Sequence, residues 1–399
     1  MNISRLFSYS SRGKGLHKFC LHTYGLLLVF IFLWIELRYL SQIYSGGHPW
    51  QTGDWLINYR SGFVRRGLVG EIIRILSEFS NLQILWIAFA LQGLFFAAAL
   101  SFHYGIIRFL SEEKIHFNLF KISVVLLSPA GVLFNAYNPD FSLRKEIIGL
   151  ALINWMYLNR LRNKGISRFY IWCSITIYAF FIFSWEAGVA FLPFVISLLL
   201  DRERIGETLR KTDLGKFYIK FLLFISALCV ILSLIFHGSS VNSKVICISL
   251  QENNEIGKEL CSGAIDAVSW SYSYFWSGST IGSPLRMLGF LCIFIVACLP
   301  FFYSSTIQMH KWLAIQFGLG FLAFNVLAAD TGRLIYAFAC VLTNQMVFDV
   351  LNRAPGDRFS EGHLRNTKIR FTTKAVTTLT YITLWTVPAS GNPWSFLRI

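Results

Sequence analysis

Charged residues are scarce in this chain. Only 14% of its 399 residues are Asp, Glu, Lys or Arg, whereas a soluble domain usually has about 25%. Hydrophobic residues make up 55%, and apolar runs of roughly 20 residues recur, each long enough to cross about 30 Å of hydrocarbon. This composition excludes an ordinary soluble domain. It predicts an all-α fold, a polytopic bundle of transmembrane helices.

The chain also lacks the motifs with which enzymes bind nucleotides or activate a serine. It has no Walker loop, no dinucleotide-binding fingerprint and no Gly-x-Ser-x-Gly elbow. The expected cytoplasmic loop 351–370 is too short for a nucleotide-binding domain, so a substrate has to be delivered by the membrane and no cofactor is expected. The net charge of +15 fits topology and lipid headgroups, and no nucleic-acid partner is expected.

Eleven spans are expected in a single integral membrane domain, 1–399. Basic residues precede the first span and no small-residue cleavage site follows it, so this is a retained helix with a cytoplasmic N-terminus. Most lysines and arginines then fall in cytoplasmic segments, as the positive-inside rule requires. The fourth and sixth spans are short for a full crossing. The spans are 21–43, 82–107, 119–136, 147–158, 169–184, 187–200, 217–236, 283–303, 312–328, 334–350 and 371–387.

The first outer loop, 44–81, concentrates unusual charges in "GDWLINYRSGFVRRGLVGEI". Two interpretations stay open for its arginines. They snorkel to headgroups from an interfacial helix over 63–79, or they bind phosphate, since nearby glycines let the backbone approach a ligand. The phosphate interpretation is favoured. These interpretations concern Arg65 and Arg66, and the loop's site candidates also include Asp54 and Arg60.

Three further outer segments bring ionisable residues to the same face. These are "NAYNPDFSLRKE", "SWEAG" and "DTGR". Charge near membrane depth is costly and usually functional, so we expect the segments to form one composite site with the first loop. The candidates are Asp140, Arg144, Lys145, Glu146, Glu186, Asp330 and Arg333.

Several of these residues also have a structural interpretation. Asp140 follows Asn-Pro and is a candidate N-cap of the next helix. Glu186 either pairs with an arginine or keeps a raised pKa suited to proton transfer. Asp330 and Arg333, three residues apart, can satisfy one another.

Two cysteines stand apart from the apolar helices. Cys247 and Cys261 lie in the long outer loop 237–282, which is expected to face an oxidising space where a disulfide persists. We expect a bridge between them, with two unrelated thiols as the alternative. No spacing of His, Cys and carboxylates in the chain provides a metal site.

The chain resembles the C-type (GT-C) glycosyltransferase superfamily and related polymerases of bacterial surface polysaccharides. The resemblance covers most of the chain: a first helix, a large outer loop with an aspartate in "TGDWL", many spans, and the blocks "NYRSGFVRRGLVGEI", "NPDFSLRKE" and "DTGR". It implies a multi-pass protein of the bacterial inner membrane that uses polyprenyl-phosphate-linked sugars. The family often has adjacent acidic residues in this loop and a C-terminal soluble domain. Asp54 stands alone, so metal dependence is not implied.

The expected function is transfer of a sugar from a polyprenyl-phosphate or pyrophosphate donor to a glycan or lipid acceptor. Arginines hold the leaving phosphate in this mechanism. Asp54 is the first choice for the base and Glu186 the second. The alternatives are a flippase or anion carrier that binds the same substrate in transit, or a non-catalytic scaffold. The absence of an internal repeat argues against alternating access.

Overall fold

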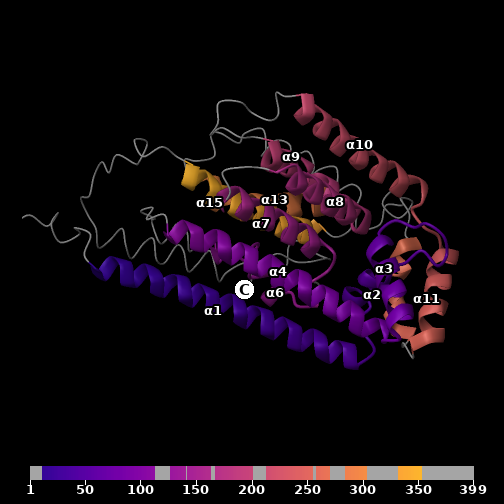
Figure 1. Ribbon diagram of the computed structural model, residues 1–399. Coiled ribbons are helices and arrows are strands. Elements are labelled where there is room, and N and C mark those ends of the chain that lie inside the picture. Colours follow the sequence, from indigo (N-terminus) through magenta and orange to yellow (C-terminus); the bar gives the residue numbers. More distant parts are fainter. Residues whose placement is uncertain are drawn as a thin grey trace, which may run out of the picture.

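The computed structural model describes residues 11–112, 126–140, 142–162, 167–200, 213–254, 258–269, 284–302 and 331–352. Every regular element in these ranges is a helix, which confirms the all-α class. Long helices run in roughly one direction, and short helices gather at one end of them (Figure 1).

Within the described residues, three helices are long and apolar enough to cross a membrane. They are α1 (Ser11–Tyr44), α4 (Ile84–Glu112) and α10 (Asp213–Ile235). A helix of this length satisfies its own backbone hydrogen bonds, which hydrocarbon requires. By their length and composition, these helices indicate a membrane protein.

The remaining long elements surround α7 (Glu146–Arg162). It packs against α4, α8 (Arg168–Ser184), α9 (Leu192–Leu200) and α15 (Thr331–Asn352). A further helix, α13 (Pro284–Phe302), contacts α15. Nearly all of α7 is buried, so it forms the centre of the described bundle.

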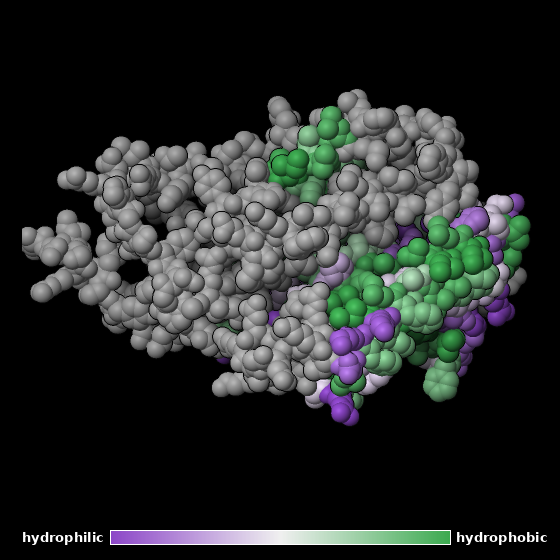
Figure 2. All heavy atoms as spheres, turned by 90° about the horizontal axis from the view of Figure 1, so that it is seen from above, coloured by the Kyte–Doolittle hydropathy of each residue, from purple (hydrophilic) through white to green (hydrophobic). Residues whose placement is uncertain are grey.

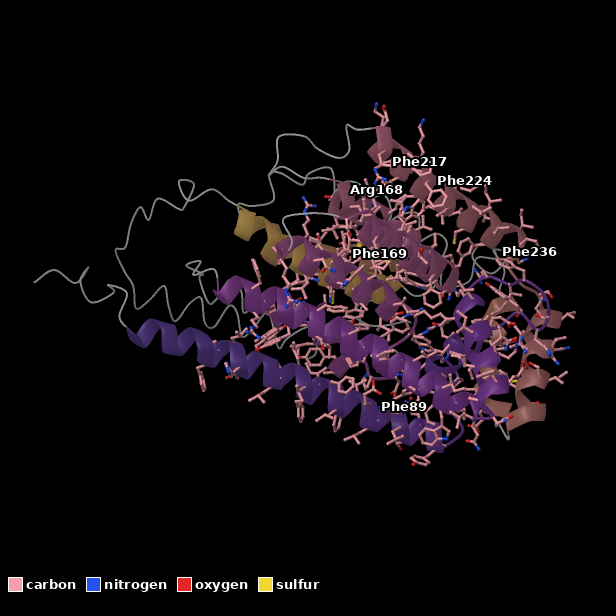
Figure 3. All side chains as sticks on the ribbon, in the orientation of Figure 1. Phe89, Arg168, Phe169, Phe217, Phe224 and Phe236 are labelled. Atoms are coloured by element: carbon pink, nitrogen blue, oxygen red, sulfur yellow. A yellow bond between two sulfur atoms is a disulfide. The ribbon has the colours of Figure 1, made fainter. Side chains whose placement is uncertain are left out.

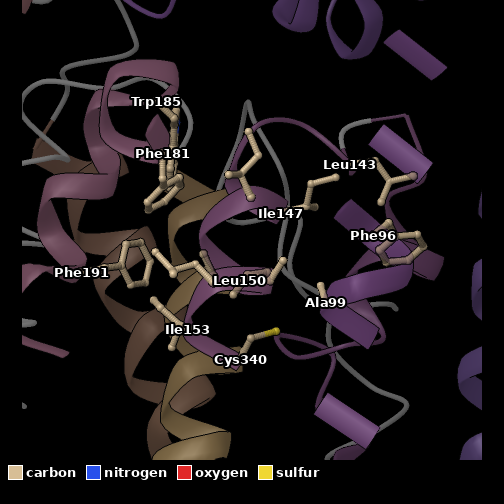
Figure 4. Packing of buried hydrophobic residues seen from close by; sticks show 14 of the residues in the cluster. Phe96, Ala99, Leu143, Ile147, Leu150, Ile153, Phe181, Trp185, Phe191 and Cys340 are labelled. Carbon is tan, nitrogen blue, oxygen red and sulfur yellow. The ribbon is translucent and has the colours of Figure 1, made fainter. Parts of the chain in front are cut away.

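Close packing against α7 depends on a glycine. Leu150 and Ile153 of α7 face a group of aromatic side chains that includes Phe181 and Phe191 (Figure 4). A Cβ on Gly149 would lie 2.1 Å from the Phe181 ring, so this position has no room for any side chain. The ring fills the space that glycine leaves on the helix, and α8 approaches α7 closely there.

Short helices form a layer at one end of the bundle (Figure 1). They are α2 (Gln51–Leu56), α3 (Leu68–Ser80), α11 (Ser240–Asn254), and the 3-10 helices η4 (Lys258–Ser262) and η5 (Asp266–Ser269). The layer is fixed covalently by a disulfide between Cys247 on α11 and Cys261 on η4. It is also attached to the bundle through contacts of α3 with α4 and α8.

Most of the exposed surface of α10 is apolar. Phe217 and Phe224 project from it (Figure 3) and are half exposed or more. Figure 2 shows a band of hydrophobic side chains on one face of the molecule, bordered by hydrophilic ones. Such a surface suits lipid contact.

The structure corrects several boundaries expected from the sequence. The expected span 119–136 does not continue as one helix to 136, because its described part, 126–136, consists of one helical residue, Leu126, then turns and the start of the short α6 (Phe134–Tyr137). The expected span 187–200 begins with the 3-10 helix η2 (Glu186–Phe191) before α9. The interfacial helix expected over 63–79 begins at Leu68. The spans 312–328 and 371–387 and the loop 351–370 lie outside the described residues.

Candidate functional site

A buried ion pair joins α2 to the segment that precedes α7. Arg144 Nε lies 3.3 Å from Asp54 Oδ2, and the two side chains are 2% and 0% exposed. The indole of Trp55 donates a hydrogen bond to the carbonyl oxygen of Leu143 at 2.9 Å. The Arg144 guanidinium also lies over the ring of Trp50, 5.8 Å from its centroid, in a cation–π arrangement.

A second group of charges lies where the loop before α3 meets η2. Arg66 bonds both carboxylate oxygens of Glu186 through its Nε at 2.8 and 2.9 Å, and Arg65 Nη1 lies 3.8 Å from the same carboxylate. Lys145 Nζ donates to the carbonyl oxygen of Arg66 at 2.6 Å. Lys145, next to Arg144 in the chain, therefore connects this group to the first.

The start of α15 adds a third pair. Arg333 Nη1 bonds Glu146 Oε2 at 3.0 Å, and both side chains are buried. Asn135 Nδ2 donates to the Tyr336 hydroxyl at 2.9 Å one turn farther along α15. Glu146 follows Lys145 directly, so the third pair continues the same cluster.

We call these eight residues the charge cluster. Five are cationic and three are carboxylates, so the cluster carries a net excess of two positive charges. Its members come from α2, the loop before α3, the start of α7, η2 and α15, which are widely separated in sequence. They are Asp54, Arg65, Arg66, Arg144, Lys145, Glu146, Glu186 and Arg333.

The excess of positive charge lowers the pKa of two carboxylates that lie outside the membrane-spanning helices, Asp54 and Glu186. Burial on its own raises the pKa of Asp54, but Arg144, Lys145, Arg333 and Arg66 outweigh it and hold the pKa well below the usual range. Burial likewise raises the pKa of Glu186, while its arginine partners bring it down to about 2. Both groups are therefore ionised at neutral pH.

For the pKa of Lys145, burial outweighs the neighbouring charges. Burial lowers its pKa to about 8, and Asp54 opposes that shift only in part. Its ammonium group therefore loses its proton within a pH range that enzymes experience, unlike the neighbouring guanidinium groups.

Two residues of the cluster region adopt strained backbone conformations. Arg66 has φ of 64° and Leu143 has φ of 59°, in the left-handed region that L-residues avoid. Strain of this kind persists where the surrounding structure enforces it, and it often marks functional sites. Both residues directly position cationic side chains of the cluster.

The cluster keeps acceptor capacity that the described part of the chain does not use. Neither carboxylate oxygen of Asp54 has a hydrogen-bond partner there, and the same holds for Glu146 Oε1 and Asn135 Oδ1. Buried polar atoms are almost always hydrogen-bonded to protein, water or ligand. These oxygens therefore indicate a place where a polar ligand or water enters the cluster.

Three of the residues predicted for the site are not in the cluster. Asp140 bonds Arg38 and Gln42 of α1, and because α7 begins at Glu146, the prediction that Asp140 caps this helix is wrong. Arg60 is exposed and lines a separate polar pocket of about 410 Å³ beside α3. Asp330 lies outside the described residues, so its pairing with Arg333 stays a prediction.

Some residues that shape the site were not predicted from the sequence. Trp55 on α2 and Trp50, the residue just before α2, both contact the segment that precedes α7. Asn135 and Tyr336 bond one another beside Glu146. The aromatic residues beside Asp54 were visible in the sequence, but nothing in it showed that they contact residues 143 and 144. Among the described residues, no group of three or more His, Cys, Asp or Glu could hold a metal ion.

Comparisons with known proteins give the chain no relative. No family model, no curated protein and no solved structure matches it.

Proposed function

We propose that the protein is a membrane glycosyltransferase that moves a sugar from a polyprenyl-phosphate or pyrophosphate donor to a glycan or lipid acceptor. The observation that carries this proposal is the buried cationic excess of the charge cluster at one end of a membrane helical bundle. Guanidinium groups match phosphate oxygens in geometry and charge. A lipid-linked phosphate is an anion that a membrane can deliver to such a cluster.

The proposed topology places the cluster on the outer face of a bacterial inner membrane. Eleven spans and a cytoplasmic N-terminus would put α2, α3 and α11 outside. The disulfide of α11 and η4 supports this orientation, because such bonds persist in oxidising compartments.

The proposed reaction needs a base for the acceptor hydroxyl. Asp54 is ionised and its oxygens keep acceptor capacity, so it suits this role. When a phosphate engages Arg144, the ion pair with Asp54 weakens and the carboxylate becomes a stronger base. Glu186 bonds Arg66 through both oxygens, and it therefore serves better to position the arginines.

The transfer then proceeds as one displacement. The acceptor oxygen forms a bond to the anomeric carbon as the bond from that carbon to the phosphate oxygen breaks. The hydroxyl proton goes to Asp54, and the leaving phosphate keeps the electron pair. The arginines and Lys145 stabilise the charge that develops on this phosphate.

The test uses purified protein in nanodiscs with a panel of polyprenyl-phosphate and polyprenyl-pyrophosphate sugars and an acceptor extract. We expect transfer by the wild type, loss in Asp54→Asn and Arg144→Gln, and no change in Arg168→Ala, whose side chain is exposed at the start of α8. Transfer that survives in both cluster variants would overturn the proposal.

A second candidate function is transport of the same lipid-linked sugar. The buried carboxylate of Glu36 in the spanning helix α1 favours it, because ionisable groups at membrane depth often line transport pathways. Movement of the lipid-linked sugar across liposomes without any transfer product would select this candidate.

A further inference from the structure

Polar side chains lie buried between α1 and α4 in the membrane-spanning part of the molecule. Glu36 and Tyr39 come from α1 and Gln92 from α4, with exposures of 9%, 1% and 0%. Gln51 and Asp54, also buried, belong to α2, which contacts α4 at the end of the bundle. We call these five residues the polar lane.

Because α1 and α4 pack antiparallel, Glu36 and Gln92 lie at the same depth along the two helices. The rings of Tyr44 and Trp86 meet at 5.3 Å, and those of Tyr39 and Phe89 at 5.6 Å. Glu36 and Gln92 are therefore each roughly 12 Å from the helix end that adjoins α2, at 1.5 Å rise per residue. They lie well inside the hydrocarbon layer of the proposed topology.

Glycine makes room for the Glu36 carboxylate on α4. A Cβ added at Gly93 would lie 3.2 Å from Glu36 Oε2, tighter than ordinary contact. Deeper along the same interface, Phe32 and Phe96 close the gap with ring centroids 5.7 Å apart. The lane is therefore bounded by aromatic rings on the side away from α2.

The lane contains many buried polar atoms that the described part of the chain leaves without a hydrogen bond. They are Glu36 Oε1, both polar atoms of the Gln92 amide, both of the Gln51 amide, and both oxygens of Asp54, whereas the Tyr39 hydroxyl bonds Thr52 of α2. Each such group in an apolar environment is costly, and bound water is the usual remedy. Water fits the chemistry because the set offers donors and acceptors together.

No charged group among the described residues faces Glu36. Tyr39, on the same helix, interacts electrostatically with Glu36, while α4 presents the amide of Gln92, and α6, which contacts α1, carries Tyr137. A carboxyl group in this setting has water or a proton as its remaining partner.

From this arrangement we infer that the polar lane holds a file of ordered water that connects Glu36 to Asp54 and exchanges protons between them. In each transfer one carboxylic acid loses a proton and becomes a carboxylate, the other carboxylate gains a proton, and every water in the file ends neutral. This inference does not depend on sugar transfer, because the lane lies inside the bundle and its hydration can be measured without any substrate.

Thiol accessibility tests the hydration of the lane. The six cysteines outside the disulfide are replaced by alanine, and Gln92→Cys or Ile153→Cys is added. Gln92 and Ile153 are equally buried, but Ile153 lies among apolar side chains of α7 (Figure 4). We expect 2-aminoethyl methanethiosulfonate to modify the Gln92→Cys protein about tenfold faster than the Ile153→Cys protein, since only hydrated, ionised thiols react quickly. Equal slow rates would show that the lane is dry and overturn the inference.

Carbodiimide labelling tests the proton exchange. Dicyclohexylcarbodiimide reacts with protonated carboxyl groups, and mass spectrometry with Glu36→Gln as the blank measures labelling at Glu36. We expect labelling to fall as the bulk pH rises in the wild type. In Gln92→Leu, with unchanged helical circular dichroism and a monodisperse elution profile, this response should disappear. Labelling of the wild type that does not respond to pH would overturn the proton path even if the lane is wet.

Discussion

Arg144 Nε lies 3.3 Å from Asp54 Oδ2, and both side chains are buried. The pair joins α2, from the end layer, to the segment that begins the central helix α7. Loss of one partner leaves the other as an uncompensated buried charge, whereas loss of both leaves a less costly neutral site. The pair therefore couples the stability of the end layer to the electrostatics of the charge cluster.

Asp54→Asn should destabilise the protein by about 3–5 kcal/mol, the cost of breaking a buried ion pair. The double variant Asp54→Asn/Arg144→Gln should recover part of that loss. Denaturant unfolding in detergent measures both. Lys216→Ala, which removes an exposed ion pair with Asp213, should cause no measurable change and is the control. A double variant as unstable as the sum of the two single ones would show that the residues act independently.

Protonation of Glu186 at acidic pH should destabilise the protein. Its folded pKa is about 2, below the ordinary value of 4.5, because of Arg66 and Arg65 despite burial. A depressed folded pKa adds stability that is fully present above the unfolded value and is lost as pH falls through the folded one. The decline in melting temperature between about pH 4.5 and pH 2 should therefore be shallower in Glu186→Gln. Glu259→Gln, exposed on η4, should keep the wild-type slope, and equal slopes in all three proteins would contradict the prediction.

The sequence was sufficient to predict the helical class and the residues of most of the cluster. The length of the hydrophobic runs predicted α1, α4, α8 and α10, because the thickness of the hydrocarbon sets the length of a helix that crosses it. Charges in apolar surroundings predicted Asp54, Arg144 and Glu186 as site residues, because a charge there is costly and is kept only where it forms an ion pair or has a function. The pairing itself is not visible in the sequence, which allows Glu186 either an arginine partner or a raised pKa; only the fold brings Arg66 to it.

Other features depended on contacts between distant segments. The segment after 126 contains an apolar run, yet it forms turns and α6, because tertiary packing against α1 and against Tyr336 of α15 overrides the local pattern. Asp140 looked like a helix cap from "NPD", but Arg38, about a hundred residues earlier, holds it instead. Glu36 was hidden inside an otherwise ordinary spanning helix, and its surroundings appeared only when α4 was placed beside α1.

Removal of the disulfide should destabilise the end layer. Cys247 and Cys261 are 14 residues apart and join α11 to η4. In the chain-entropy model a bridge over a loop of this length contributes roughly 3 kcal/mol. We therefore expect Cys247→Ser/Cys261→Ser to lower the free energy of unfolding by about that amount, and dithiothreitol to reproduce the loss in the wild type but not in the variant. A wild-type protein that is insensitive to reductant would contradict the prediction.

Gly70 should tolerate no side chain. A Cβ there would lie 1.9 Å from the carbonyl oxygen of Ile57, so α3 touches the backbone that follows α2. Gly70→Ala forces that backbone away and should cost about 1–3 kcal/mol, as other overpacking changes do. Ile75→Ala, on an exposed position of the same helix, should have little effect. The measurement is thermal unfolding in detergent, and a Gly70→Ala protein as stable as Ile75→Ala would show that the contact is not rigid.

Lys145 should make anion binding depend on pH in the alkaline range. Burial lowers its pKa to about 8, while the guanidinium groups around it stay charged. As pH rises through about 8 the ammonium group loses its proton, so the cluster loses one of its five cations and should bind anions less tightly. Calorimetric titration of the wild type with inorganic pyrophosphate should show affinity falling across this range. In Lys145→Arg the affinity should stay constant, because the guanidinium keeps its proton there. In Lys145→Met it should be low at every pH. Equal pH dependence in the wild type and Lys145→Arg would assign the titrating group elsewhere and exclude Lys145 from the anion site.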